Sequence, residues 1–543
     1  MANSQLDSYK DVVQNHQDQL DALLRKGVYQ PVFIYHVVIF NMLPLIGLLI
    51  PRRGTTRFVR PGMFVICVAI AAEVLTRRRA LLGGHGYMIG LMTAWWLLWS
   101  AALFVFLDVE NDVRRIERGP RAAESILAEH GHQDLSKGAA TASARKASRL
   151  SGNVCHENGQ ALATESTKPG DETFHWQSYP RKMTHRAEWC AGLLFNLRGP
   201  EWNWRQPHLG PLPRSVYNQV GRGFETGRFQ VQDDTTYPRA QDRLRAAFWQ
   251  FLQAYLLLDC LKVIMMRDVY FRGWTTQNAP PPVPFSYVAA YPVLVRLYRS
   301  FVSGMGVFVA LNFVTSLNPI FFLGLSTAFP NAARKLTGAP LGASWLYADA
   351  FGPFGSSLLD HGIAGCWGRW WHQLFRHGFA TTARFILSLL PEKWSASSRV
   401  KQLIYVLVSF TASGLVHAAG SLSQFGDTSP ISGPFLFFFS QGIAMIVERT
   451  IKTDVLPRLG LGQIPRPLCR AINAVYVCSW LLYSGALIAD DFARGGLWLI
   501  DPIPISPLRG LGLASDKGWW CWDSPWFGYW SDGTYWGSGI RLL

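Results

Sequence analysis

The stretch LIYVLVSFTASGLVHAAG, residues 403–420, is an apolar run that contains a single histidine, His417. A membrane-spanning helix needs roughly 17–25 apolar residues, and this run meets that length. Ionisable groups inside membrane segments are costly and usually face a cavity or a partner. Ser413 lies one turn before His417 and small residues follow it, so a ligand or another helix has room to approach. We interpret His417 as a functional histidine. The alternative is a core histidine that donates a hydrogen bond to a neighbouring helix.

The composition of the whole chain agrees with a membrane protein. Of its 543 residues, 49% are hydrophobic and only 16% are charged, against roughly 25% charged residues in soluble proteins. The 22 tryptophans and 33 phenylalanines suit bilayer cores and interfaces. We therefore predict an all-α integral membrane protein, a multi-helix bundle with roughly eight or nine transmembrane segments of about 20 residues each.

The net charge of +16 does not indicate a nucleic-acid binder. Basic residues occur in short runs beside apolar segments, as at 51–60 and 76–80, which is typical of membrane-flanking charge. The eight cysteines are scattered and include no CxxC pair, so neither a disulfide framework nor a zinc site is supported. No metal site is expected.

The N-terminal half is predicted to contain three parts. Residues 1–31 form a polar tail with an amphipathic helix, which we expect to lie on the membrane surface. Residues 32–107 hold membrane segments, of which 63–75 is shorter than a spanning helix needs. This run either crosses where its neighbours thin the bilayer or is re-entrant. Residues 108–245 form a polar loop, and its middle, about 119–185, has too few large apolar residues to order and should be disordered.

The C-terminal half is predicted to be a catalytic membrane domain, residues 246–490, followed by an aromatic, Gly- and Pro-rich cap, 491–543. Within this domain we expect Asp259 to pair with Lys262 one turn away. Glu448 precedes an arginine at a segment end and is expected to mark the membrane interface. No string of charges suits an ion or proton pathway.

The segment CWGRWWHQLFRHGF, which begins at Cys366, carries a second histidine, His372. If 366–380 is one helix, its aromatic residues form a broad apolar face, and a polar strip runs along the other side: Arg369, His372, Gln373 and Arg376. An interfacial helix whose arginines reach lipid phosphates is the alternative. Four hydrogen-bonding groups without an acidic partner instead favour a site for a negatively charged or electron-rich ligand.

WGRWWHQLFR at 367–376, SGLVHAAG at 413–420 and RGPEWNW at 198–204 together resemble the wax-synthase-like branch of the membrane-bound O-acyltransferase superfamily. The resemblance covers about 190–490 and is strongest to fungal members that acylate terpenoid and other secondary metabolites. The segment FGPFGSSLLDHGIAGC at 351–366 departs from the family by lacking its Pro- and Phe-rich lead-in. This departure concerns how the preceding chain leads into the motif, and it does not affect the chemistry of the motif residues.

The resemblance implies a multi-pass protein of the endoplasmic reticulum membrane with a substrate tunnel between its helices. It would transfer an acyl group, most simply acetyl from acetyl-CoA, to a hydrophobic alcohol. His417 is then the catalytic base and His372 the second catalytic histidine. The donor- and acceptor-binding residues are expected to be Trp371, Gln373 and Ser413, with Arg369 and Arg376 on the CoA phosphates. Ester formation needs a base and a group that stabilises the oxyanion, which suits these side chains.

Two alternatives stay open. Long-chain transfer to a fatty alcohol or a sterol uses the same groups and differs in tunnel width, which one sequence does not reveal. A transporter or lipid-binding protein should instead have paired half-repeats or helices broken at corresponding positions, and the sequence has neither. The oligomeric state, the membrane orientation and the acceptor are not indicated.

Overall fold

A computed structural model describes residues 8–119, 173–210, 212–221, 231–232, 236–276, 279–461, 464–514 and 518–543. Helices dominate this part of the chain, and its four sheets have two short strands each, which confirms the predicted all-α class. The helices of seven or more residues are α1 (Tyr9–Arg25), α2 (Ile34–Leu49), α3 (Val59–Arg77), α4 (Tyr87–Ala101), α7 (Met183–Leu194), α8 (Arg214–Val220), α9 (Ala240–Arg267), α10 (Pro292–Asn318), α12 (Pro330–Leu336), α13 (Phe354–Gly365), α14 (Arg376–Ser388), α16 (Ser398–Ser423), α17 (Leu436–Thr450) and α19 (Arg466–Arg494).

Seven helical stretches of the described residues are long and apolar enough to cross a membrane, which confirms an integral membrane protein. They are Gly54–Arg77, Tyr87–Phe106, Ala240–Arg267, Pro292–Ala328, Ser398–Ser423, Ile431–Arg458 and Arg466–Arg494. Helix α2 is apolar but has only 16 residues, below the roughly 17–25 that a spanning helix needs. The predicted eight or nine segments therefore exceed the seven found among the described residues.

The apolar run 63–75, whose status the sequence left open, belongs to a longer helical stretch that is long enough to cross a membrane. Helix α3 begins at Val59 and continues from a 3₁₀ turn, Gly54–Phe58, so the helical stretch has 24 residues. Arg60 lies inside this helix and is buried because its guanidinium has partners there. It donates to the carbonyl oxygen of Gly47 (3.2 Å) and to the Glu110 carboxylate (2.7 Å). Arg60 therefore lies within the helix and does not mark the boundary that a charged residue beside an apolar run would indicate.

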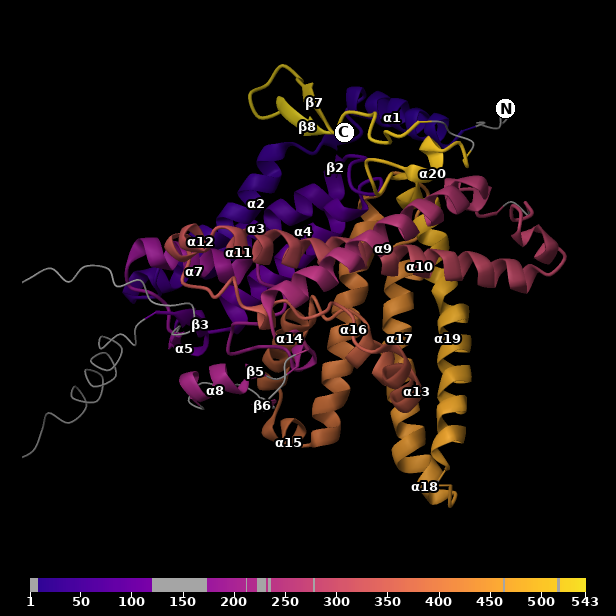
Figure 1. Ribbon diagram of the computed structural model, residues 1–543. Coiled ribbons are helices and arrows are strands. Elements are labelled where there is room, and N and C mark those ends of the chain that lie inside the picture. Colours follow the sequence, from indigo (N-terminus) through magenta and orange to yellow (C-terminus); the bar gives the residue numbers. More distant parts are fainter. Residues whose placement is uncertain are drawn as a thin grey trace, which may run out of the picture.

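Helix α4 is the central helix of the bundle. In its apolar window 61% of the residues are buried, against 22–44% in the other six spans, as expected for a helix that is apolar on all sides. It packs most extensively against α16, which also contacts α14 and α17. Helices α16, α17 and α19 run side by side away from the rest of the molecule (Figure 1).

The two ends of the chain pack against each other. Helix α1 lies beside the C-terminal segment, with α20 (Pro507–Gly510) and the hairpin of β7 (Phe527–Trp530) and β8 (Gly539–Leu542) at the same end of the molecule (Figure 1). The Tyr9 hydroxyl donates to Asp501 (3.0 Å) and accepts from Arg509 (2.7 Å). The amphipathic helix exists as predicted, but its apolar face covers protein, with Tyr9, Val12, Leu20 and Leu24 buried.

The predicted ion pair between Asp259 and Lys262 does not form. Both side chains instead bind groups of the C-terminal segment. Asp259 accepts hydrogen bonds from the Ser506 hydroxyl and from the backbone N–H of Leu508 (2.9 Å). The Lys262 ammonium donates to three backbone carbonyls, among them that of Trp498 (2.9 Å), and lies 3.8 Å from Asp501. Both charges therefore anchor the 498–508 segment to α9, because its backbone polar groups need partners once buried.

The C-terminal edge of the predicted disordered region, 119–185, is ordered. Strand β4 (Phe174–Gln177) pairs antiparallel with β3 (Arg115–Arg118), and α7 begins at Met183. Residues 120–172 of that prediction lie outside the described residues. The other sheets join β1 (Gln30–Pro31) to β2 (Arg78–Arg79) and β5 (Leu212–Pro213) to β6 (Val231–Gln232), both in parallel.

Glu448, expected at the membrane interface, is buried inside the protein. Its carboxylate accepts from the backbone N–H groups of Ile363 (3.2 Å) and Ala364 (3.0 Å) and from the Lys452 ammonium (2.8 Å). These donors are free because α13 kinks at Gly362, whose φ of +65° suits glycine. The looser lead-in to the motif is thus a kinked helix held by a carboxylate on α17.

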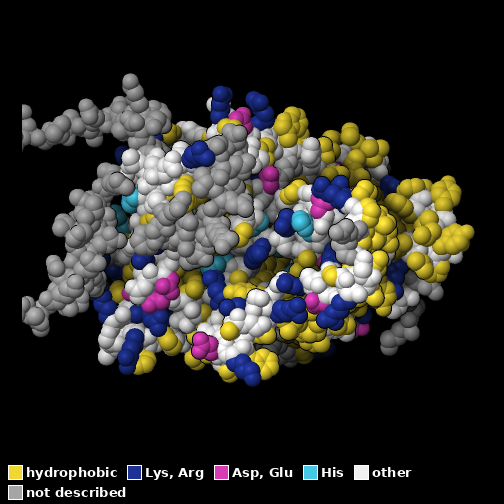
Figure 2. Space-filling view, turned by 90° about the horizontal axis from the view of Figure 1, so that it is seen from below, with side chains coloured by type: hydrophobic (Ala, Val, Ile, Leu, Met, Phe, Trp, Pro, Cys, Tyr) yellow, Lys and Arg dark blue, Asp and Glu magenta, His cyan; other side chains and the backbone are white. Residues whose placement is uncertain are grey.

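The outer surface agrees with a lipid-facing bundle. Seen from below, hydrophobic side chains cover much of the right-hand part of the molecule, while Lys and Arg side chains gather around its middle (Figure 2). Exposed apolar residues on the spanning helices include Val65, Leu256, Val314, Leu415, Val447 and Val475. Large exposed apolar surfaces of this kind mark contact with membrane or partners.

Candidate active site

The segment 366–380 is not one helix, and this corrects our interpretation of a continuous polar strip. A π-helical turn, Cys366–Trp370, ends at Trp371, whose backbone is extended, and α14 begins only at Arg376. Gln373 stabilises this break, since its side-chain amide donates to the carbonyls of Trp367 (2.6 Å) and Trp371 (2.7 Å). Both amide protons are therefore used within the turn, and Gln373 holds the turn instead of offering a donor to a ligand.

His372 lies in this turn among aromatic rings. Its imidazole is 5.3 Å from the ring of Trp371, 6.1 Å from Phe351 and 6.2 Å from Phe375. Its Nδ1 is buried and has no hydrogen-bond partner among the described residues. Burial, followed by the positive charge of Arg198, lowers the pKa of His372 to about 4. The imidazole is therefore neutral near pH 7, with one ring nitrogen available to a ligand.

His417 lies on α16 and is held from two sides. Its Nδ1 is 2.6 Å from the hydroxyl oxygen of Tyr87, the first residue of α4. Its ring stacks on Phe438 of α17, with centroids 4.2 Å apart and planes at 18°. Among the described residues, Nε2 has no hydrogen-bond partner.

The small residues around His417 allow another helix to pack closely. This is one of the two alternatives given from the sequence, the other being a ligand. At Gly90 of α4 an added Cβ would lie 2.0 Å from the carbonyl oxygen of Ala419. At Gly420 it would lie 2.7 Å from the Tyr87 ring. The two backbones therefore approach closely because both residues lack a side chain. This approach brings Tyr87 to His417.

The structure brings the two predicted histidines to one site. Trp371 neighbours His372 and lies 5.7 Å from the ring of Trp367, which is 5.8 Å from Phe438, the residue stacked on His417. The imidazoles are also close enough to interact electrostatically. An aromatic wall thus connects them.

A basic loop covers the His372 side of this site. The RGPEWNW motif continues into His208, whose two ring nitrogens are buried without partners among the described residues. Burial, then the charges of Arg198, Arg376 and Arg205 together with His372, lower the pKa of His208 to about 2. These groups therefore lie near one another although they come from two distant segments. Carboxylates balance this basic group only in part, with Asp349 near Arg198 and Glu201 near Arg205.

The aromatic residues of RGPEWNW have a structural part. Trp202 and Trp204 are buried, and Trp204 stacks on His377 of α14 with centroids 4.0 Å apart. Because His377 follows the 371–375 turn directly, this stack ties the basic loop to the turn. The motif therefore places Arg198 and His208 against His372.

The remaining predicted site residues lie around the same turn or helix. Arg369 is exposed on the π-helical turn, and Ser413 is half-buried on α16. Arg376 is exposed, and its guanidinium donates to the carbonyl of Gly368 (3.2 Å) and to the side-chain oxygen of Gln373 (3.1 Å). Trp371 is half-buried in the aromatic wall.

Sequence reasoning missed Tyr87, Phe438 and His208. Tyr87 and Phe438 are ordinary apolar-segment residues by composition, and no local pattern separates them from other aromatic residues. His208 follows the RGPEWNW motif by four positions, so its place beside the motif was the signal available.

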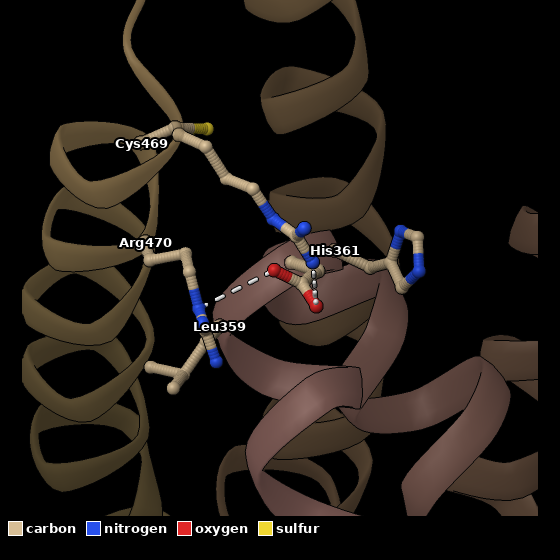
Figure 3. A pocket seen from close by; sticks show the side chains of 6 residues that line it. Leu359, His361, Cys469 and Arg470 are labelled. Atoms are coloured by element: carbon tan, nitrogen blue, oxygen red, sulfur yellow. Dashed lines mark hydrogen bonds and ion pairs between the residues drawn. The ribbon is translucent and has the colours of Figure 1, made fainter.

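The protein also has a cavity away from His372 and His417. A cavity of about 260 Å³ between α13 and α19 is lined by Leu359, Asp360, His361, Arg466, Cys469 and Arg470. Figure 3 shows that Cys469 and Arg470 come from one helix and face the residues of α13. Asp360 forms ion pairs with Arg466 (3.4 Å) and Arg470 (3.3 Å), so its charged groups satisfy one another. Across the described residues, no three His, Cys, Asp or Glu side chains cluster as metal ligands.

Comparison with known proteins places this site in a family. Residues 347–440, which include both His372 and His417, match the model of the membrane bound O-acyl transferase family. Over these residues the chain is similar to that family. The predicted superfamily is thereby confirmed, and the match supports an acyltransferase.

Curated relatives are similar at low identity. O-Mevalon transferase yanI of Aspergillus niger is 24% identical over 280 residues, 49% of this chain and 53% of that protein. O-Mevalon transferase macI of Penicillium terrestre is 25% identical over 309 residues, 55% of this chain and 61% of that protein. An acetyltransferase of Fusarium sporotrichioides is 22% identical over 355 residues, 61% of this chain and 70% of that protein. The chain thus spans little more than half the length of the first two relatives. No solved structure matches it significantly.

Proposed function

We propose that this protein is an acyl-CoA-dependent O-acyltransferase that esterifies the hydroxyl of a hydrophobic acceptor. The observation that carries the proposal is the convergence of His417 and His372 on one aromatic-walled site inside the matched region. A base for the hydroxyl proton and a donor for the thioester oxygen are the two groups that ester formation needs.

In the proposed reaction, Nε2 of His417 takes the proton of the acceptor hydroxyl while its oxygen attacks the thioester carbonyl carbon. A carbon–oxygen bond forms and the carbon–sulfur bond breaks. The proton then passes from His417 to the departing thiolate, so the products are the ester and free CoA. His372 donates a hydrogen bond to the carbonyl oxygen as it gains negative charge, which suits a neutral imidazole without a protein partner at Nδ1.

The basic residues near His372 suit the phosphates of CoA. Arg198 and Arg376 lie close enough to His208 to influence it electrostatically, and Arg369 is exposed on the turn before His372. Forked guanidinium donors bind phosphate oxygens strongly. CoA would therefore place its phosphates on the RGPEWNW side and its thioester toward the histidines. Trp371 and Ser413 would contact the substrates between these two ends.

The central test is His417→Ala, assayed in microsomes for ester formation from acetyl-CoA. Loss of a general base lowers the rate by about 10²- to 10⁴-fold, and we expect kcat to fall within this range. His361→Ala is the control, since His361 is exposed at the second cavity. Full activity of a normally expressed His417→Ala protein contradicts the proposed reaction.

The transferred group has two candidates. The acetyltransferase relatives favour acetyl, as we expect from the sequence. The first two relatives are O-mevalon transferases, which favours a mevalonyl group instead. To identify the transferred group, microsomes are incubated with acetyl-CoA, mevalonyl-CoA or palmitoyl-CoA, each with farnesol, ergosterol or hexadecanol. The esters formed distinguish acetyl from mevalonyl transfer and test long-chain transfer. Acceptor-dependent release of free CoA also distinguishes an enzyme from a transporter or lipid-binding protein, which would release none.

The same proposal includes the cellular setting implied by the family resemblance. The protein would act in the endoplasmic reticulum membrane on a terpenoid or other secondary metabolite, with the substrate tunnel and the principal catalytic groups in 246–490. The terpenoid alcohol farnesol in the acceptor panel tests the substrate class, and immunolocalisation of the tagged chain tests the compartment.

A further inference from the structure

The hydroxyl of Tyr87 has an unusual place for a membrane-helix tyrosine. It is 5% exposed, and His417 Nδ1, at 2.6 Å, is its only hydrogen-bond partner among the described residues. The two residues are 330 positions apart in the chain. A distance this short at a buried site indicates that the two groups are held together by their helices.

Packing fixes the tyrosine ring as well as the imidazole. The ring of Tyr87 meets Phe492 edge-on with centroids 5.0 Å apart, and it also packs closely against α16 at Gly420. Phe438 covers one face of the imidazole. With Nδ1 turned to Tyr87 and a ring face on Phe438, only Nε2 remains for a reacting group.

We propose that Tyr87 is a positioning residue for His417. Base chemistry at Nε2 requires the proton to be on Nδ1, and the Tyr87 oxygen is the acceptor that this Nδ1–H has within hydrogen-bonding distance. The contact therefore holds the orientation of the base, and the Tyr87 oxygen can accept from Nδ1–H in the tautomer that leaves Nε2 free. The inference rests on the proposed function, because it assigns a partner to the base of that reaction.

The hydrogen bond is useful throughout the reaction. When Nε2 takes the acceptor proton, the imidazolium carries a proton on each nitrogen, and Nδ1–H continues to donate to the Tyr87 oxygen. When Nε2 releases its proton to the thiolate, the ring returns to the starting tautomer. Tyr87 itself gains and loses no proton in this cycle.

Tyr87→Phe tests the inference with little change in packing. Loss of a group that orients a functional histidine lowers activity by about 10- to 100-fold, and we expect this fall in kcat, with KM for acetyl-CoA and farnesol within about twofold. Tyr179→Phe is the matched control, because it removes a hydroxyl that bonds the Leu48 carbonyl at the same 2.6 Å outside the site. It should change neither constant.

Two further measurements separate positioning from structure. In a His417→Ala protein, adding Tyr87→Phe should cause no further loss, since the tyrosine acts through the histidine. The unfolding temperature of Tyr87→Phe should match that of Tyr179→Phe. The inference is overturned if kcat stays within twofold of wild type, or if the loss appears in KM together with a lower unfolding temperature. Retained activity in His417→Ala alone overturns the proposed reaction instead.

Discussion

At the scale of single residues, the informative groups are those whose hydrogen bonds are incomplete. Gln373 was expected to contact a ligand, yet both its amide protons are bound within the turn. His372 and His208 have ring nitrogens that are buried without partners among the described residues. Buried polar groups are usually satisfied, so these nitrogens are where a bound ligand would complete the structure.

The same histidines should make stability depend on pH. Burial, aided by Arg198, lowers the pKa of His372 to about 4 and that of His208 to about 2, whereas an unfolded histidine has a pKa of about 6.5. Below pH 6.5 the unfolded chain binds protons that the folded protein does not. The contribution of these two histidines to the free energy of unfolding is therefore complete above pH 6.5, and it falls as the pH is lowered toward 4.

Thermal unfolding in detergent between pH 7.5 and 5 measures this effect. We expect the unfolding temperature to fall with pH, and to fall less steeply in His208→Asn, which lacks one of the groups. His361→Asn at the exposed site should keep the wild-type slope. Equal slopes in all three proteins would show that the buried histidines do not cause the pH dependence.

At the scale of helices, the site depends on one break and one crossing. The break at Trp371–Phe375 puts His372 on a turn, so the 3–4 spacing of 366–380 misled the prediction of a continuous strip. The crossing of α4 and α16 depends on Gly90 and Gly420, where the helices are in contact. Without this contact Tyr87 and His417 would not meet.

Gly90→Ala should separate the two helices. Its Cβ would lie 2.0 Å from the Ala419 carbonyl oxygen, a backbone atom that cannot turn away. Overpacking of this kind costs about 1–3 kcal/mol, so we expect a lower unfolding temperature and a fall in kcat. Gly485→Ala on α19 is the control, since an added Cβ meets no atom within 4 Å there. Equal behaviour of the two variants would argue against a tight crossing.

At the scale of the whole molecule, segments distant in the chain share one core. The largest hydrophobic cluster includes residues of α1, α4, α7, α16 and the segment after α19. The catalytic histidine proposed on α16 thus receives its tyrosine from the N-terminal segments. The domain boundary at 246 stays a prediction.

The contact between the two chain ends should contribute to stability. Arg509 is buried and donates to Asp501 (2.5 Å) and Tyr9 (2.7 Å). Breaking a buried ion pair from one side costs about 3–5 kcal/mol, so we expect Arg509→Ala to lower the unfolding temperature markedly. Lys10→Ala removes an exposed ion pair with Asp523, worth at most about 1 kcal/mol. Similar shifts in the two variants would contradict this role.

The sequence by itself determined the membrane class and the family resemblance, and it singled out both histidines as candidates. These follow from local properties, because a spanning helix is recognised by its apolar length and a histidine within it by its cost. Only the tertiary structure decided the Tyr87–His417 contact, the basic loop over His372 and the anchoring of Asp259 by the C-terminal segment. Each of these joins residues far apart in the chain, and their meeting depends on how helices pack, which periodicity and composition do not encode.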